Sequence, residues 1–133
     1  MRPAEAASPM ATLRDVMSTS VVTTAPQTPL AQAAAAMVAA GAGSAVVMQG
    51  SFLAGIVTER DVLRAAASGQ DLRDSAVSEW MTADPQSADP DSSPEEAAQI
   101  MLLNGFRHLP VVDGRNLCGV VTLRDLFAAR IRR

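Results

Sequence analysis

Two stretches, GIVTERD at residues 55–61 and GVVTLRD at residues 119–125, decide how this chain is organised. The offset between them is 64 residues, and it holds without a gap along most of the chain. It superposes Met17 on Met81, Pro26 on Pro90, Ala33 and Ala34 on Ala97 and Ala98, Met37 on Met101, Gly41 on Gly105, Val47 on Val111, Gly50 on Gly114, Leu53 on Leu117 and Ala65 on Ala129. A register kept this long indicates an internal duplication.

Each copy begins with a β-prone run and continues into a helix. In the first copy the run is 21–24, and Thr28 followed by Pro29 predicts a helix cap with a first-turn proline. Apolar residues then recur at helical spacing, and Gly41 is expected to end the helix. The second copy repeats these features with a weaker run at 85–88, a capping box from Ser93 to Glu96, and Gly105 at the helix end.

A hairpin and a last helix complete each copy. Runs at 44–48 and 52–57 flank a turn at 49–51, and runs at 108–112 and 116–121 flank a turn at 113–115. The last helices are expected to open at Thr58 and Thr122. The resulting order, β-α-β-β-α, predicts an α+β fold. One copy has too little area to cover a three-stranded sheet, so we expect the two to pack sheet to sheet about a pseudo-twofold axis.

The domain boundaries follow from the duplication. We expect a flexible tail at 1–10, the first repeat at 11–68, a polar surface linker at 69–76 and the second repeat at 77–133. The stretches LRDVM at 13–17 and VSEWM at 77–81 are predicted to be short lead-in helices before each first strand. Trp80 is expected to cover an edge of the core.

Composition excludes several classes of function. The chain has 133 residues, 48% of them hydrophobic, a net charge of −3 and a pI near 5.0. An acidic chain with 3% aromatic residues lacks the basic surface and the stacking platforms that bind nucleic acid. The only cysteine, Cys118, is expected to be a small core residue. We expect a cytoplasmic protein, because no stretch suits a signal peptide or a membrane span.

Catalysis and metal binding are not expected. All 11 basic residues are arginine, so there is no phosphate-binding loop lysine, and the single histidine and single cysteine lie far apart in sequence. The aspartates that the duplication repeats, Asp61 and Asp125, suit two equivalent binding positions better than an acid and a base with different pKa values. We therefore expect no enzyme activity.

The repeated motif places a threonine and an aspartate where a strand passes into a helix. Free N–H groups and the positive end of the helix dipole favour an anion there. A hydroxyl beside a carboxylate suits a phosphorylated ribose. The alternative is a capping box that starts the helix without any ligand. Both copies also share a glycine before the threonine and an Arg-Asp pair after it, which capping alone does not require.

These residues resemble those of a pair of CBS domains, the Bateman module named after cystathionine β-synthase. The family motif, Gly-apolar-x-Thr/Ser-x-x-Asp/Asn, is met by Gly55, Thr58 and Asp61 and again by Gly119, Thr122 and Asp125. The stretch RHLPVVD at 107–113 is similar to the second strand of the family. The resemblance covers about residues 13–130. It implies that AMP, ADP, ATP or S-adenosylmethionine binds in a cleft between the repeats as a regulatory ligand.

The resemblance also implies roles for individual residues. Asp61 and Asp125 would hold ribose hydroxyls, and Thr58 and Thr122 would meet phosphate. Arg60 and Arg124 are candidate phosphate counter-charges or, alternatively, solvated helix arginines. Gly43 and Ser44 in the first copy, and Arg107 and His108 in the second, would line the adenine; Thr19, Val21, Ala83 and Pro85 would close the other side.

Two functions from different classes remain open. One is a sensor, in which nucleotide shifts the population of module conformations and thereby acts on an unidentified protein partner. The other is a ligand-free module for dimerisation or protein interaction, since paired CBS domains commonly form homodimers. The first copy departs from the second at 43–46, which predicts unequal occupancy of the two sites, with Arg107 favouring ligands that carry more phosphate.

Overall fold

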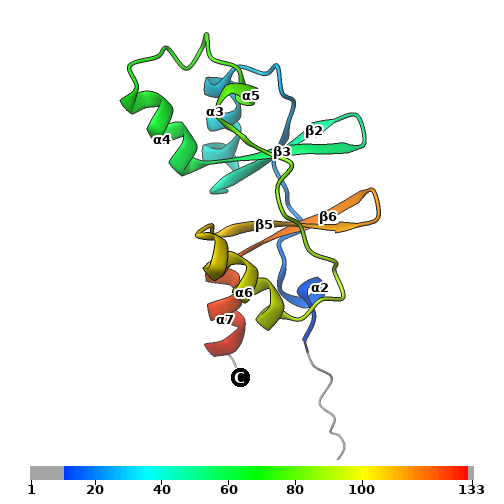
Figure 1. The fold of residues 1–133 in the computed structure, drawn as a ribbon. Coiled ribbons are helices and arrows are strands. Elements are labelled where there is room, and N and C mark those ends of the chain that lie inside the picture. Colours follow the sequence, from blue (N-terminus) through cyan, green and yellow to red (C-terminus); the bar gives the residue numbers. More distant parts are fainter. Residues whose placement is uncertain (1–10, 132–133) are drawn as a thin grey trace, which may run out of the picture. The chain divides into compact units, whose positions relative to one another are not determined.

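The structure, a computed structural model, describes residues 11–131. The expected tail at 1–10 lies outside them. The helices are α2 (Leu13–Val16), α3 (Leu30–Ala40), α4 (Glu59–Ala67), α5 (Val77–Trp80), α6 (Pro94–Asn104) and α7 (Leu123–Ile131). The strands are β1 (Thr23–Thr24), β2 (Ser44–Gln49), β3 (Phe52–Thr58), β4 (Thr82–Ala83), β5 (His108–Asp113) and β6 (Asn116–Thr122). The chain therefore has the predicted mixed α+β fold (Figure 1).

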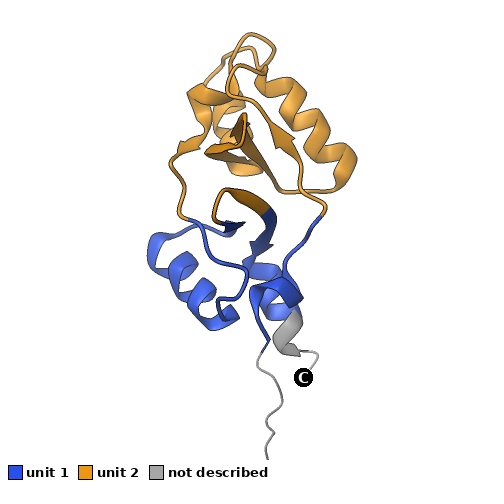
Figure 2. Cartoon of the chain, turned by 90° about the vertical axis from the view of Figure 1, so that its right-hand side faces the viewer, with its two compact units in different colours: residues 1–19, 87–113, 118–133 blue, residues 20–86, 114–117 orange. Residues whose placement is uncertain are grey.

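The chain divides into two compact units, coloured separately in Figure 2. Of the described residues, unit 1 contains 11–19, 87–113 and 118–131, and unit 2 contains 20–86 and 114–117. Neither unit is one continuous repeat of the sequence. Each combines the main part of one repeat with the lead-in helix that precedes the other.

Unit 2 contains a sheet with one strand more than the sequence indicated. Its four strands have the order β1-β2-β3-β4, with β1 parallel to β2 and the other neighbours antiparallel. The additional strand, β4, follows lead-in helix α5 and pairs Ala83 with Gly55. The predicted run at 21–24 forms a strand only at Thr23–Thr24.

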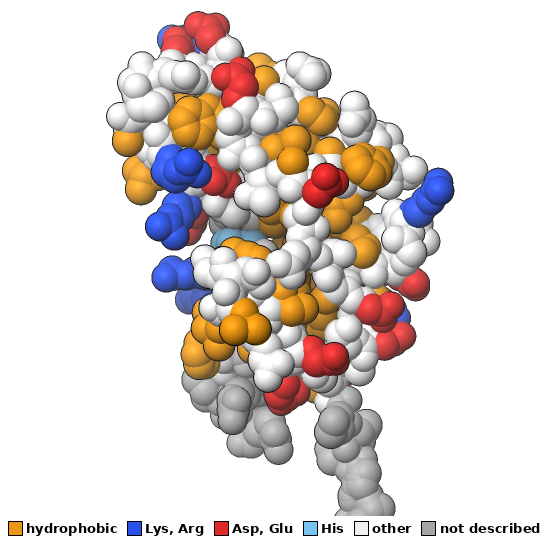
Figure 3. All heavy atoms as spheres, in the orientation of Figure 1, with side chains coloured by type: hydrophobic (Ala, Val, Ile, Leu, Met, Phe, Trp, Pro, Cys, Tyr) orange, Lys and Arg blue, Asp and Glu red, His pale blue; other side chains and the backbone are white. Residues whose placement is uncertain are grey.

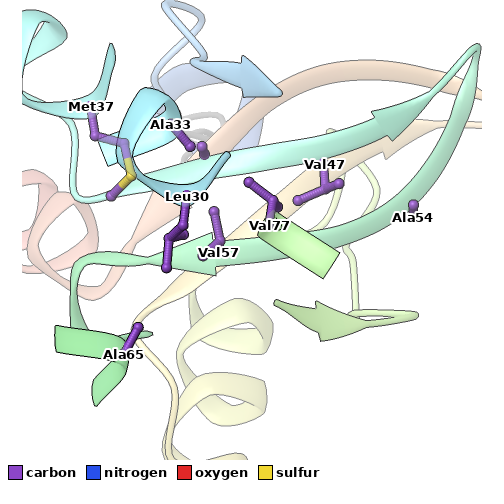
Figure 4. Packing of buried hydrophobic residues seen from close by; sticks show 9 residues of the cluster. Leu30, Ala33, Met37, Val47, Ala54, Val57, Ala65 and Val77 are labelled. Carbon is purple, nitrogen blue, oxygen red and sulfur yellow. The ribbon is translucent and has the colours of Figure 1, made fainter. Parts of the chain in front are cut away.

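The core of unit 2 lies between this sheet and helices α3, α4 and α5. Leu30 and Met37 from α3, Val57 from β3 and Ala65 from α4 are all buried in one apolar cluster. Val77 of α5 points into the same cluster and is fully buried (Figure 4). The lead-in helix therefore belongs to the core itself rather than to its surface.

Unit 1 repeats this plan at positions 64 residues away. Strands β5 and β6 form the hairpin, and α6 and α7 lie on the same side of it (Figure 1). Single bridges join Ser18 to Val120 and Ala88 to Val111, where unit 2 has the strands β4 and β1. The weak β-prone run at 85–88 is thus reduced to one bridge. Leu13 of α2 is fully buried against Met101, Leu109 and Val121.

The helix ends agree with the sequence at most positions. Gly41 and Gly105 end α3 and α6 in the left-handed conformation, with φ of 65° and 76°. The predicted capping box at Ser93 is confirmed, since Ser93 Oγ accepts the Glu96 N–H and Glu96 accepts the Ser93 N–H. The predicted cap at Thr28 is wrong: α3 begins after Pro29 and has no side-chain cap.

The start of α3 is capped by a distant backbone. The N–H groups of Leu30 and Ala31 donate to the carbonyls of Ser75 and Leu72, at 2.8 and 3.0 Å. Those residues belong to the segment predicted to be a surface linker, yet Ser75 is buried and Leu72 packs against the core of unit 2. In the same segment, the backbone N–H and side chain of Arg73 donate to Asp71 and lower the pKa of its carboxyl group.

The two motif glycines allow the lead-in segments to approach closely. A Cβ on Gly55 would lie 2.7 Å from the carbonyl oxygen of Thr82 and 2.6 Å from Met81 Sδ. A Cβ on Gly119 would lie 2.5 Å from the carbonyl oxygen of Ser18. These distances are shorter than real Cβ contacts, so the glycines are required by packing. Strand pairing therefore accounts for a feature that helix capping left unexplained.

The exchange of lead-in helices predicts a crossed pattern of destabilisation. Leu13→Ala should destabilise unit 1 by about 2–5 kcal/mol, because it leaves a cavity in the core that α2 shares with α6 and α7. Hydrogen exchange should then accelerate at 97–126. Val77→Ala should instead accelerate exchange at 30–65. Faster exchange within each mutated residue's own repeat would contradict the exchange of helices.

The close approach at the glycines predicts a second effect on stability. Gly119→Ala should lower the free energy of unfolding by about 1–3 kcal/mol, because the new methyl group forces the Ser18 backbone away from β6. Gly55→Ala should act similarly at β4. Urea denaturation measures the change, and Ser51→Ala at the exposed turn between β2 and β3 is the reference. Midpoints equal to that of the reference variant would show that the lead-in segments are not held this tightly.

Candidate functional site

The candidate site in unit 2 lies where β3 ends and α4 begins. Ser44 pairs with Thr58 across the β2–β3 ladder, and the Glu59 N–H donates to the Gly43 carbonyl at 3.0 Å. Thr58 is extended, with φ of −120°, and caps α4. The fold thus brings the predicted residues Gly43, Ser44, Thr58 and Asp61 together at one strand-to-helix junction, the unit 2 junction.

The Asp61 carboxylate is turned back toward the start of its own helix. Its Oδ2 accepts the Thr58 N–H at 2.8 Å and the Thr58 hydroxyl at 3.1 Å. The Asp61 N–H donates in return to Thr58 Oγ1 at 3.4 Å. Asp61 is 9% exposed, so these bonds are shielded from water. The capping-box alternative considered for the sequence is therefore what the structure shows at this junction.

A cation that the motif did not indicate also contacts Asp61. Arg64 Nη1 donates to Asp61 Oδ1 at 3.3 Å, and the guanidinium carbon lies 5.9 Å from the centre of the Trp80 ring. Trp80 comes from α5 and packs against the core of unit 2, as expected for a residue at a core edge. The spacing of three residues between Asp61 and Arg64 on a helix was the signal available for this pair. Nothing local indicated Trp80.

The junction in unit 1, between β6 and α7, is built in the same way but has fewer contacts. The Thr122 N–H donates to Asp125 Oδ2 at 3.0 Å, and the Asp125 N–H donates to Thr122 Oγ1 at 3.0 Å. The Leu123 N–H donates to the Arg107 carbonyl at 3.0 Å, which places Arg107 and His108 beside Thr122. Among residues 11–128, whose side chains are described, no arginine forms an ion pair with Asp125, and Ala128 stands where α4 has Arg64.

The residues predicted to close the ligand site lie on the lead-in segments. Ala83 is in β4 beside Gly55, and Pro85 follows it in unit 2. Thr19 directly follows the bridge from Ser18 to Val120 in unit 1. Val21 precedes Val22, whose carbonyl accepts the Val46 N–H, and belongs to unit 2. Val21, Ala83 and Pro85 therefore belong to unit 2 and Thr19 to unit 1, and Ala83 pairs three residues before Thr58 on β3.

A further occurrence of part of the motif, without its glycine, shows how much of it is structural. The letters TLRD occur at 122–125 and also at 12–15, where Thr12 and Asp15 form a capping box at the start of α2. That box is exposed, is not preceded by a described strand and starts a helix of four residues. A threonine and aspartate at this spacing thus need no ligand to explain them.

The arginines of the motif have no such structural explanation. Arg60 and Arg124 are both exposed at equivalent positions in the first turn of α4 and α7. Neither forms an ion pair with any residue between 11 and 131. Two arginines without an ion pair to a described residue therefore lie in the first turns of two helices. This is an arrangement that can bind an anion.

Two further features bear on the class of protein. In the described part of the chain, no group of three or more His, Cys, Asp and Glu side chains is placed to hold a metal ion. Within residues 11–131 there is also no helix with the length and apolarity needed to cross a bilayer.

Comparison with known proteins identifies the family. The model of the CBS domain matches residues 13–68 and 77–132. The CBS domain-containing protein YhcV of Bacillus subtilis is 38% identical over 118 residues, which cover 88% of this chain and 84% of that protein.

Solved structures agree in fold. The CBS domain pair of MJ0100, in complex with methylthioadenosine and S-adenosyl-L-methionine, has a TM-score of 0.84 at 24% identity over 93% of this chain and 98% of its own. CBSX2 in complex with AMP has a TM-score of 0.78 at 24% identity over 92% of this chain and 97% of its own. The duplication first seen at 55–61 and 119–125 is thus a pair of CBS domains, and the chain belongs to the CBS domain family.

Proposed function

We propose that this chain is a regulatory module that binds an adenosyl ligand, AMP, ADP, ATP or S-adenosylmethionine, at its strand-to-helix junctions. The observation that carries the proposal is the pair of exposed arginines, Arg60 and Arg124, which have no ion pair among the described residues. Packing explains Gly55 and Gly119, and capping explains the threonine and aspartate. Binding of a phosphate would give these arginines a shared role at both junctions, whereas solvated helix arginines would have none.

The chemistry of each junction suits a phosphorylated ribose. The helix N-terminus and the guanidinium favour phosphate, and Thr58 and Thr122 supply a hydroxyl. A carboxylate has about four acceptor positions, so Asp61 and Asp125 can cap their helices and still accept from a ribose hydroxyl. Two structures of this fold contain adenosyl ligands, which supports the choice of ligand.

The remaining contacts follow from the strands beside each junction. Ser44 and Gly43 adjoin Thr58 and would line adenine in unit 2, and Arg107 and His108 would line it in unit 1. Thr19, Val21, Ala83 and Pro85 would close the other side of the ligand. Arg107 is exposed and carries a charge that Gly43 lacks, so the unit 1 junction would favour ligands with more phosphate. The module would transmit binding to a separate protein partner or to its own conformation.

A ligand-free interaction module is the second candidate, and a specific observation favours it. Large apolar side chains are exposed at equivalent helix positions of both repeats. They are Val38 at 81% and Leu102 at 69%, and Leu63 at 69% and Phe127 at 61%. Apolar side chains lie open among charged ones on the face drawn in Figure 3. Such side chains suit a homodimer interface or a protein partner.

Ligand binding should raise thermal stability. Unfolding should be followed with AMP, ADP, ATP and S-adenosylmethionine, with GMP as the control for the base. An adenosyl ligand at about 100 times its Kd should add about 2.7 kcal/mol to the free energy of unfolding. Asp61→Ala combined with Asp125→Ala should abolish the increase. Asp15→Ala, which removes the capping box of α2 formed by Thr12 and Asp15, is the matched control and should keep the increase.

The arginines provide the test of phosphate recognition. Arg60→Ala combined with Arg124→Ala should lower affinity for AMP but not for adenosine in isothermal titration, because only the phosphate contact is lost. If no adenosyl compound raises stability, the interaction module is the better description. Leu63→Glu combined with Phe127→Glu should then reduce the oligomer mass measured by ultracentrifugation.

A further inference from the structure

The two junctions differ in how many donors already occupy the carboxylate. Asp61 accepts three hydrogen bonds: two from Thr58 and one from Arg64. Asp125 accepts one from a described residue, the Thr122 N–H. Because a carboxylate has about four acceptor positions, the donors from the described residues leave about one position on Asp61 and about three on Asp125. A ribose diol presents two hydroxyl donors, so it can donate both to Asp125 but only one to Asp61.

Arg64 supplies one of the two additional donors, and the Thr58 hydroxyl supplies the other. Arg64 takes the Oδ1 atom of Asp61, the carboxylate oxygen that capping leaves free. Its side chain is 63% exposed, whereas that of Asp61 is 12% exposed, so the guanidinium lies on the open side of the carboxylate. The guanidinium carbon also lies 5.9 Å from the centre of the Trp80 ring, which is a cation–π contact. Unit 1 has Ala128 and Val16 at the two equivalent positions and can form neither contact.

We propose that Arg64 is a specificity-determining residue that makes the unit 2 junction accept a single ribose hydroxyl, whereas the unit 1 junction accepts both. The proposal rests on the proposed function, since it concerns the same adenosyl ligand. The unit 1 junction then fills first and selects ribose over 2′-deoxyribose. The unit 2 junction fills at higher concentration and discriminates little between the two sugars.

Arg64 is a positioning residue, so its test needs a readout that a merely structural role would not change. That readout is the ratio of the affinities for adenosine and 2′-deoxyadenosine. Both probes are uncharged, which removes any direct attraction between Arg64 and phosphate. A variant that only weakens α4 would lower both affinities together and leave the ratio unchanged.

The experiment isolates the unit 2 junction with Asp125→Ala and measures binding of both nucleosides by isothermal titration. In this background the two affinities should agree within about threefold. Adding Arg64→Ala should raise the affinity for adenosine about tenfold, because the 2′-hydroxyl can then donate a hydrogen bond to the charged carboxylate. The affinity for adenosine should then exceed that for 2′-deoxyadenosine about tenfold. Arg64→Met, which keeps apolar packing on Trp80 but removes the donors, should do the same.

The matched control is Arg73→Ala. Arg73 also pairs with an aspartate at 3.3 Å in unit 2, but that aspartate is Asp71 in the segment after α4. This variant should leave both affinities unchanged. Asp61→Ala, which leaves only the unit 1 junction, should prefer adenosine about tenfold with Arg64 present.

The outcomes separate this inference from the function on which it rests. If the unaltered chain binds adenosine but Arg64→Ala and Arg64→Met leave the ratio of affinities unchanged, the role of Arg64 is wrong and the proposed function stands. If the unaltered chain binds no adenosyl compound, the proposed function is wrong and the inference falls with it. A rise in the ratio with Arg73→Ala as well would also overturn the role of Arg64.

Discussion

The backbone contact across Gly55 and Gly119 is the constraint on which the rest of the structure depends. At each glycine a lead-in segment lies so close to the strand that no side chain fits between them. The contact fixes β4 on β3 and Ser18 on Val120. It thereby places α5, from the second repeat, in the core of unit 2, and α2, from the first repeat, in the core of unit 1. The position of Trp80 beside Arg64 follows from it.

The residues that start the helices are also those proposed to bind the ligand. Thr58 and Asp61 satisfy backbone donors at the start of α4, and Thr122 and Asp125 do so for α7. A site assembled from caps is preorganised, because the carboxylates are held before a ligand arrives. Folding stability and ligand affinity are consequently linked through the same atoms. Variants of these aspartates must be compared with a cap elsewhere in the chain before a loss is assigned to binding.

The sequence predicted what local interactions determine. Glycine conformations end α3 and α6, apolar periodicity defines the helices, and glycine turns place both hairpins, so these elements were predictable from short windows. The start of α3 was not, because its N–H groups are satisfied by Ser75 and Leu72 from more than 40 residues away. The fourth strand and the exchanged helices were missed for the same reason. Each depends on pairing between segments that are distant in the sequence. Secondary-structure propensity and hydrophobic periodicity do not report such pairing.

In the candidate site, too, local features could be predicted from the sequence and contacts between distant segments could not. Thr58, Asp61 and their counterparts were found because spacing on one helix is visible in sequence. The sequence could not distinguish a ligand site from a capping box at these residues. The exposed TLRD stretch of α2 shows why, because the same residues form the same cap in different surroundings. Arg64 was within reach of sequence reasoning through its helical spacing. Its contact with Trp80 was not, since α5 arrives from the other repeat.

The exchanged lead-in helices also determine what counts as the smallest complete form of this protein. Cutting the chain between α4 and α5 would leave each fragment with one short helix that belongs to the core of the other fragment. Neither fragment could then form a complete hydrophobic core alone. On mixing, each fragment would supply the short helix that the core of the other lacks. Fragment complementation is therefore built into the topology. Loss or gain of such domains during evolution should proceed in pairs, because half of a pair is an unfinished fold.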